Sequence, residues 1–197
     1  SEVSELIKRV EEIATKNKCS SIKTSKSDEE RLKFWTGRKA AFPACAELAP
    51  DYMCMDGSIP RGKLAEVLKE IQKLSVKYGL PVANAFHAGD GNLHPLIMFN
   101  ANDPEQLRKT EEFGAEILKY CVKVGGALTG EHGVGIEKRE LMCEAFNDTD
   151  IQQQLKIKIA LDPNSLLNPG KVYQILRKCA EEGRVHVHGG KTKFPDI

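Results

Sequence analysis

Apolar and polar positions along the chain recur with two periods, one typical of helices and one typical of strands. Helical spacing predicts long helices over residues 1–15, from Ser27 toward Trp35, from Pro60 to Gly79 and from Asp103 to Gly125, with shorter ones over 137–145 and 150–161. Residues 82–88 and 93–99 are apolar runs of strand length. Two long helices that flank a hairpin and further strands predict an α+β fold, in which helices cover one face of an antiparallel sheet.

The two apolar runs are joined by the segment His87-Ala-Gly-Asp-Gly-Asn-Leu-His94. Asp90-Gly91 is typical of a two-residue type I′ turn, because both central positions of that turn need a positive φ. With this turn His87 faces His94, and directly opposed residues have Cβ atoms about 4.5–5.5 Å apart. Two imidazoles at that separation can bind one metal ion. The alternative is that both rings are only hydrogen-bonded within the strands.

A third ligand is expected in the glycine-rich segment over residues 125–135, where Glu131 and His132 stand side by side. Two histidines and one carboxylate match the open ligand pattern of catalytic zinc sites, and they also suit Mn²⁺ or Fe²⁺, so the identity of the metal stays open. The side chains of adjacent residues diverge, so Glu131 is predicted to bind the metal and His132 to act as a general base. Alternatively, the glycines only end a helix and form a turn, and both side chains are solvated.

Composition and charge narrow the classes of partner. The chain has 29 basic and 28 acidic residues and a formal net charge of +1, which gives no electrostatic reason to expect nucleic acid or an anionic membrane. No apolar run approaches the roughly 18 residues of a transmembrane helix, and no signal peptide opens the chain. The six cysteines have no C-x-x-C spacing. They are interpreted as reduced thiols of a cytoplasmic protein.

Three motifs then occur in a recognisable order: His87 to His94, Thr129-Gly-Glu-His-Gly-Val-Gly135, and Asp162-Pro-Asn-Ser-Leu-Leu-Asn-Pro-Gly-Lys171. Together they resemble the C-terminal part of the FAD-linked 2-hydroxy-acid oxidases and dehydrogenases of the vanillyl-alcohol-oxidase type. Within that family, residues 35–43 and 51–60 are most similar to the flavin subunit of bacterial glycolate oxidases. The resemblance runs from about residue 27 to residue 173.

The resemblance implies a ferredoxin-like cap (substrate) domain over residues 1–180, followed by a loose extension over 181–197. It also implies FAD as cofactor, held by an N-terminal FAD-binding domain that this chain lacks, since no complete dinucleotide fingerprint is present. The implied substrate is a small 2-hydroxy acid, glycolate or D-lactate. An iron–sulfur subunit of a glycolate oxidase complex is an implied partner, and through such subunits the cytoplasmic protein would associate with a membrane.

The resemblance further assigns residue roles. Arg38 is expected to bind the substrate carboxylate, and the alternative is an exposed arginine at a helix end. Asn168 is expected to approach the flavin, and the alternative is a plain Asn-Pro turn. His132 would take the hydroxyl proton while the α-hydrogen leaves as hydride. A cysteine at position 54, where relatives that act on dicarboxylates carry a lysine, favours a monocarboxylate. Two other functions stay open at this point: a metal-dependent hydrolase, and a non-catalytic ferredoxin-like binding domain.

Overall fold

The computed structural model describes residues 2–173. The chain divides into two compact units, residues 1–43 and Ala44 onward, and each is described by itself. The predicted extension over 181–197 lies outside the described residues, and the boundary of the cap domain at residue 180 stays a prediction. Among the residues described, no helix has the length and apolar character needed to cross a membrane.

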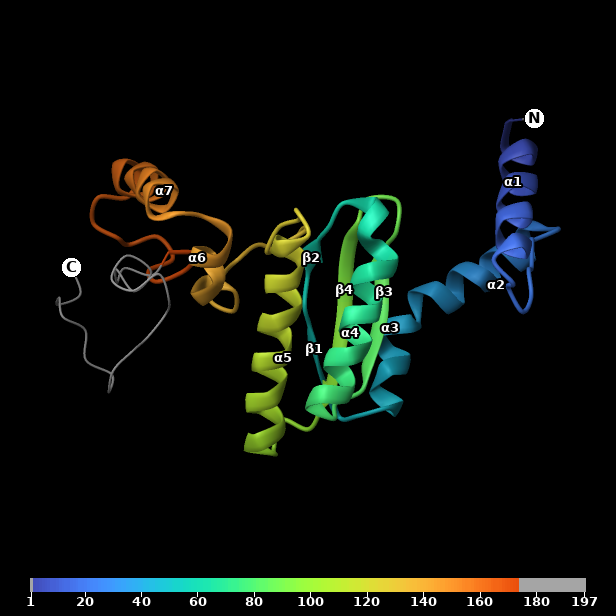
Figure 1. Ribbon diagram of the computed structural model, residues 1–197, viewed down its shortest axis with the longest axis horizontal. Helices are drawn as coiled ribbons and strands as arrows, with labels where there is room; N and C mark the ends of the chain where they lie inside the picture. Colours follow the sequence, from blue (N-terminus) through green and yellow to red (C-terminus); the bar gives the residue numbers. More distant parts are fainter. Residues whose placement is uncertain (1, 174–197) are drawn as a thin grey trace. The chain divides into compact units, whose positions relative to one another are not determined.

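The first unit is helical. It contains α1 (Glu2–Lys16) and α2 (Asp28–Lys39), and α3 (Ala41–Ala44) lies at its end (Figure 1). A capping arrangement opens α2: the Ser27 hydroxyl accepts the Glu30 N–H, and the Glu30 carboxylate accepts a backbone N–H. That second donor is Lys26 rather than Ser27 itself. The apolar stripe of α1, from Val3 to Ile13, is exposed.

The second unit is built on a four-stranded antiparallel sheet with β4 (Asn92–Phe99) in its middle. β3 (Val82–His87) pairs with one edge of β4, and β1 (Asp51–Cys54) and β2 (Gly57–Ser58) share the other edge (Figure 1). An isolated bridge between Ser58 and Ala127 extends the β2 side by one more residue. Strands and helices therefore follow one another as in a ferredoxin-like fold, with the last strand reduced to this bridge.

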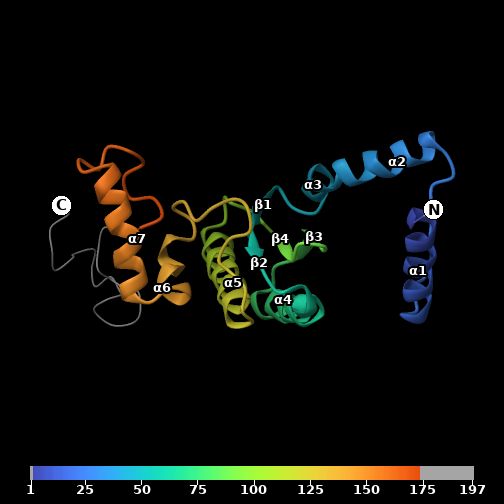
Figure 2. The same ribbon diagram turned by 90° about the horizontal axis from the view of Figure 1, so that it is seen from above.

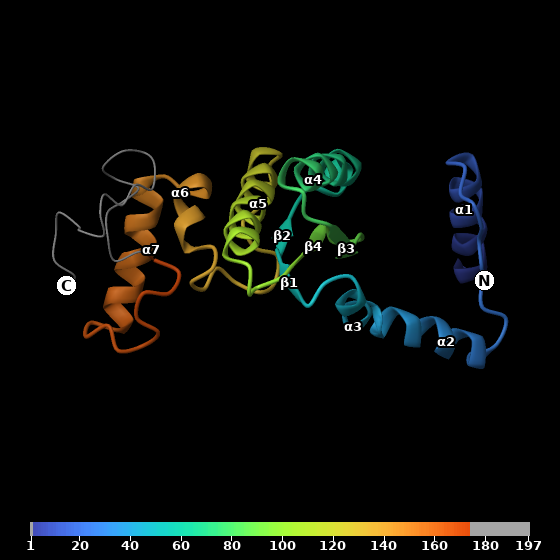
Figure 3. The same ribbon diagram turned by 90° about the horizontal axis from the view of Figure 1, so that it is seen from below.

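Helices α4 (Leu64–Tyr78) and α5 (Pro104–Lys123) lie together on one face of the sheet, as Figures 2 and 3 show from opposite sides. Side chains alternate along a strand, so β4 has two different faces. Leu93, Ile97 and Phe99 join the core beneath the helices. Asn92 and His94 therefore point to the opposite face, which is where the candidate site lies. The predicted α+β class with helices on one face is confirmed.

The remaining elements are short, except for the last helix. They are η1 (Cys45–Glu47), η2 (Arg61–Lys63), η3 (Arg139–Leu141), α6 (Met142–Ala145) and α7 (Asp148–Leu161). Pro60 was expected as a first helical residue, but it precedes η2, and α4 begins only at Leu64. The helix expected over 137–145 is reduced to η3 and α6. Gly133 and Gly135 both have a positive φ just before it, so the chain is still turning there.

The hairpin differs from its prediction in register. His87 pairs with Asn92, so four residues form the loop, and His94 lies opposite Ala85. Of the two central residues only Gly91 has a positive φ, and the N–H groups of Asp90 and Gly91 both donate to the His87 carbonyl at 3.0 and 3.1 Å. The type I′ turn is therefore wrong. Because the pairing moved by an even number of residues, His87 and His94 still share a face.

Candidate metal centre and active site

Three side chains predicted as metal ligands come together on the open face of the sheet. His87 belongs to β3, His94 to β4, and Glu131 to the loop after α5. His94 Nε2 lies 3.0 Å and His87 Nε2 3.7 Å from the same carboxylate atom, Glu131 Oε1. One ligand atom from each residue fits within a mutual distance of 4.8 Å. The two imidazole rings are 5.5 Å apart and nearly perpendicular.

The buried ring of His94 provides a test of whether these residues suit a metal. His94 is 5% exposed, and its Nε2 has no hydrogen-bond partner. The nearby Glu131 oxygen is close enough to interact but is not placed to accept a hydrogen bond. A buried polar atom without a partner is costly, and a cation coordinated by Nε2 and the carboxylate would satisfy both. Burial also lowers the pKa of His94, which favours the neutral ring that a metal requires.

The loop that carries Glu131 is held by a residue that the sequence analysis did not single out, Asp56. Its carboxylate is fully buried between β1 and β2. It accepts the Thr129 hydroxyl at 2.5 Å and the backbone N–H groups of Gly130, Glu131 and His132 at 2.9–3.1 Å. Asp56 therefore fixes the backbone of the proposed ligand and of the proposed base together.

Lys138 forms a buried ion pair with Asp56, and this pair is called the anchor of the loop. Its side chain is 3% exposed, and its ammonium lies 3.2 Å from the Asp56 carboxylate and 2.6 Å from the Asp56 carbonyl oxygen. Burial by itself would raise the pKa of Asp56, but the Thr129 hydroxyl, the loop N–H groups and the Lys138 charge together outweigh burial and lower it. Asp56 is thus a carboxylate at neutral pH. In the sequence, the only sign of this role is that Asp56 is an acidic residue flanked by core residues. Its hydrogen-bond partners Thr129 and Lys138 lie more than 70 positions away along the chain.

Gly130 is required where the loop meets the sheet. A Cβ atom on Gly130 would lie 2.0 Å from Asn92 Oδ1 and 2.8 Å from Asp56 Oδ1. No side chain fits at this distance, so glycine permits the close approach of loop and strand. The glycine-rich composition thus has a packing role at this position, in addition to the turns made by Gly133 and Gly135.

His132, the predicted base, lies beside this group and is exposed. Its ring centroid is 5.0 Å from that of His94, and its backbone N–H donates to Asp56 at 2.9 Å. Cys54 lies on the other side of His94, with its sulfur 3.8 Å from His94 Nδ1. Burial, and secondarily the Asp56 charge, raises the pKa of the Cys54 thiol to about 11.

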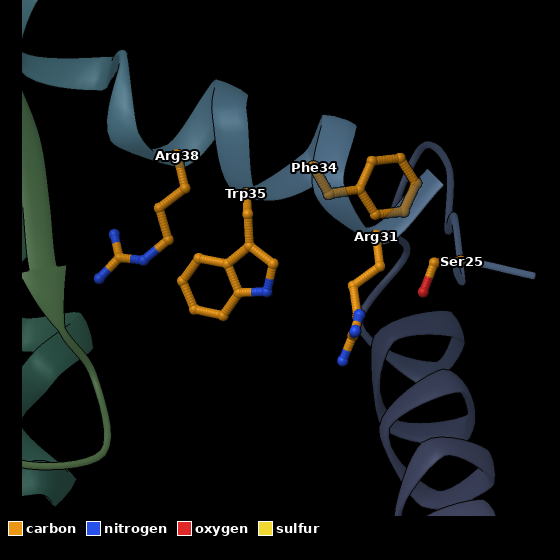
Figure 4. A pocket seen from close by; sticks show the side chains of 5 residues that line it. All are labelled: Ser25, Arg31, Phe34, Trp35 and Arg38. Atoms are coloured by element: carbon orange, nitrogen blue, oxygen red, sulfur yellow. The ribbon is translucent and has the colours of Figure 1, made fainter. Parts of the chain in front are cut away.

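Arg38 lies in the other unit, on α2. With Ser25, Arg31, Phe34 and Trp35 it lines an open pocket, and its side chain and the Trp35 indole both extend from α2 (Figure 4). A cation and an aromatic ring in one pocket suit a small carboxylate with an apolar part. The role of Arg38 toward the substrate carboxylate stays a prediction.

Asn168 is exposed and adopts a left-handed backbone conformation, with φ of 48°. Its carbonyl oxygen accepts the Lys171 N–H at 3.3 Å, and its side-chain oxygen accepts the Lys171 ammonium at 3.2 Å. These contacts are those of a local Asn-Pro-Gly turn. The predicted role of Asn168 toward the flavin is untested by them.

Comparison with known proteins places this geometry in context. Residues 1–172 match the family model described as FAD linked oxidases, C-terminal domain. The glycolate oxidase subunit GlcD of Escherichia coli is 49% identical over the whole chain, which spans 40% of that relative's length. GlcD of Bacillus subtilis is 32% identical over 85% of the chain and 36% of its own length.

A solved structure supports the fold. The 4-ethylphenol oxidase of Gulosibacter chungangensis, in an isoeugenol complex, matches 66% of this chain and 26% of its own with a TM-score of 0.52 and 22% identity. This likeness concerns the fold alone. The chain therefore spans well under half the length of the relatives it matches.

Proposed function

Because the chain belongs to the FAD-linked oxidases, C-terminal domain family, we propose that it is the substrate- and metal-binding part of a flavin-dependent enzyme. That enzyme would oxidise a small 2-hydroxy acid, glycolate or D-lactate, to the 2-oxo acid. The observation that carries this proposal is the meeting of His87, His94 and Glu131 around the unpartnered nitrogen of His94. Relatives named glycolate oxidase subunit and D-lactate dehydrogenase support the substrate class.

Oxidation of a 2-hydroxy acid requires loss of the hydroxyl proton and of the α-hydrogen as hydride. A divalent ion, zinc or manganese, would be held by His87, His94 and Glu131 and would act as a Lewis acid toward substrate oxygens. FAD would accept the hydride. The described residues contain no complete dinucleotide fingerprint, so we propose that the protein's own FAD-binding domain holds the flavin.

The chain's own side chains supply proton transfer and orientation. His132 is exposed next to the buried His94, so its ring can reach a bound substrate and remove the hydroxyl proton. Asp56 holds the His132 backbone and so limits the positions that the ring can take. Arg38 would pair with the substrate carboxylate through its planar fork of donors, and Asn168 would contact the flavin.

The partners follow from the same proposal. Relatives described as a subunit of glycolate oxidase favour assembly with other subunits, and the family resemblance implies that one of them carries an iron–sulfur cluster. We place the enzyme in the cytoplasm, with any membrane contact made through those subunits.

Two variants of the full-length enzyme test the assigned roles. His132→Ala should lower kcat by about 10²–10⁴, the usual loss for a general base, with the flavin retained. Arg38→Ala should raise KM and lower kcat/KM, because the carboxylate is bound in both the ground and the transition state. Lys39→Ala, its exposed neighbour, is the matched control and should change neither. A His132→Ala enzyme with wild-type kcat at saturating hydroxy acid would contradict the mechanism at its central step.

A further inference from the structure

His94 lies between two sets of ligand atoms. β4 has β3 on one side and β1 on the other, and each neighbour brings one metal-binding side chain toward His94. His87 comes from β3, and its register partner is Asn92, two residues from His94. Cys54 comes from β1, and its register partner is Leu96, again two residues from His94. All three side chains therefore point to the same open face.

The two edges of the imidazole ring face different groups. Nε2 lies 3.0 Å from Glu131 Oε1, in the site already described. Nδ1 lies 3.8 Å from the Cys54 sulfur. The loop contributes to both sets, because Glu131 lies near Nε2 and the ring centroid of its neighbour His132 is 5.0 Å from that of His94. Ligand atoms of Cys54, His94 and His132 lie within 4.8 Å of one another, a limit that the first set also meets.

We propose that Cys54, His94 and His132 form a second metal site, selective for thiophilic divalent ions such as Zn²⁺ and Cd²⁺. One thiolate and two imidazoles are softer donors than two imidazoles and a carboxylate, and soft donors prefer these ions to Mn²⁺. Three protein ligands leave a fourth position open on the exposed side of His132. Binding breaks the Cys54 S–H bond and forms a sulfur–metal bond, and the proton passes to the buffer.

Occupation of this second site has a consequence for the first. A neutral imidazole has one nitrogen free to bind a metal, since the other carries the proton. His94 can therefore serve one site at a time, and an ion held by Cys54 also removes His132 from its role as a base. A soft ion would thus inactivate the enzyme by coordinating through the second site. This last step rests on the proposed function, but binding at the site does not.

Cadmium titration of the full chain tests the site directly. With a non-thiol reductant present, Cd²⁺ should produce an ultraviolet cadmium–thiolate charge-transfer band that saturates at one equivalent. Cys54→Ser should abolish the band, and His132→Gln should weaken cadmium binding by more than about tenfold, comparable to losing a supporting group of a metal site. The matched control Cys19→Ser removes an exposed thiol and should leave the band unchanged.

A second pair of variants separates this site from the first. His87→Ala and Glu131→Gln remove ligands of the proposed catalytic metal but should keep the cadmium–thiolate band. If both variants also stop hydroxy-acid oxidation in the full-length enzyme, the proposed function and the second site stand independently. A band that survives Cys54→Ser, or that is indifferent to His132→Gln, would mean that cadmium binds another thiol or Cys54 alone, and would overturn the proposal.

Discussion

Replacing Asp56 by asparagine tests whether the buried anchor positions the site. The change keeps the shape of the side chain but removes its charge, while Lys138 stays in place with a side chain that is only 3% exposed. Asp56 accepts hydrogen bonds from Thr129, from three loop N–H groups and from Lys138. An amide can accept only some of these, so some loop N–H groups lose their acceptor and Lys138 loses its counter-charge.

The expected cost follows from the uncompensated charge. Removing one partner of a buried ion pair costs about 3–5 kcal/mol, because the remaining ion has lost its solvation and its counter-charge. Asp56→Asn should therefore lower the free energy of unfolding at neutral pH by about this amount. Lys138→Met should cost less, since Asp56 keeps its Thr129 and backbone donors. A typical domain has about 5–15 kcal/mol in total, so both variants should stay measurable.

The pH dependence has a definite sign. The folded pKa of Asp56 lies below its unfolded value of about 3.9, so its contribution to stability is fully present above pH 4. The contribution is lost as the pH falls through the folded pKa. The stability gap between wild type and Asp56→Asn should therefore be largest near neutral pH and narrow on acidification below about pH 4.

Urea unfolding followed by circular dichroism measures the stability, and zinc calorimetry measures the site. Asp56→Asn should weaken zinc binding about 10–100-fold, as the loss of a supporting group does. Asp162→Asn is the matched control. Asp162 is another buried aspartate that accepts two loop N–H groups and pairs with a lysine, but it contacts none of the site residues. Asp162→Asn should lower the free energy of unfolding by about 1–3 kcal/mol and leave the zinc affinity unchanged. Full zinc affinity in Asp56→Asn would refute the positioning role.

Two further predictions concern the metal and the loop. Zinc at 100 times its dissociation constant should stabilise the wild-type chain by about 2.7 kcal/mol and raise its Tm. A chelator should reverse this stabilisation, and the double variant His87→Ala with His94→Ala should abolish it. An unchanged Tm on zinc addition would count against the ligand set. Gly130→Ala should destabilise by about 1–3 kcal/mol, because its Cβ would lie 2.0 Å from Asn92 Oδ1. Gly37→Ala, with nothing within 4 Å of its Cβ on α2, should instead stabilise by roughly 0.5–1 kcal/mol. Equal effects in urea unfolding would show that the loop relaxes.

Local signals correctly predicted where α5 begins and where α4 ends, but they predicted the turn type wrongly. Asp103 and Pro104 open α5, and Gly79 ends α4 in a left-handed conformation, as their residue types indicate. Each of these depends on contacts within one helical turn. The hairpin loop instead depends on a distant segment: the Ile59 N–H donates to the Gly91 carbonyl at 2.9 Å. A Cβ on Gly91 would lie 2.1 Å from the Ile59 carbonyl oxygen. Turn preferences alone carry no information about that contact.

The meeting of His87, His94 and Glu131 was nevertheless predicted, because it depended on the face of the strand and not on the register. A shift of two residues leaves every side chain on its own face, whereas a shift of one would have separated His87 from His94. The anchor could not be found in this way. Nothing in the sequence distinguishes Lys138 from the other lysines, and only the folded chain brings its ammonium to within 3.2 Å of the Asp56 carboxylate.

The buried pair of Asp56 and Lys138 explains how the backbone of an exposed candidate site can be held in place. His87, Glu131 and His132 are all exposed, and exposed loop side chains are usually mobile. Here the backbone of two of them is fixed from beneath by Asp56, and the third belongs to a strand paired along its whole length with β4. The side chains can therefore stay open to a ligand while their Cα positions are held by the core. Rigid support below an open first layer of ligands is what selective metal and substrate binding requires.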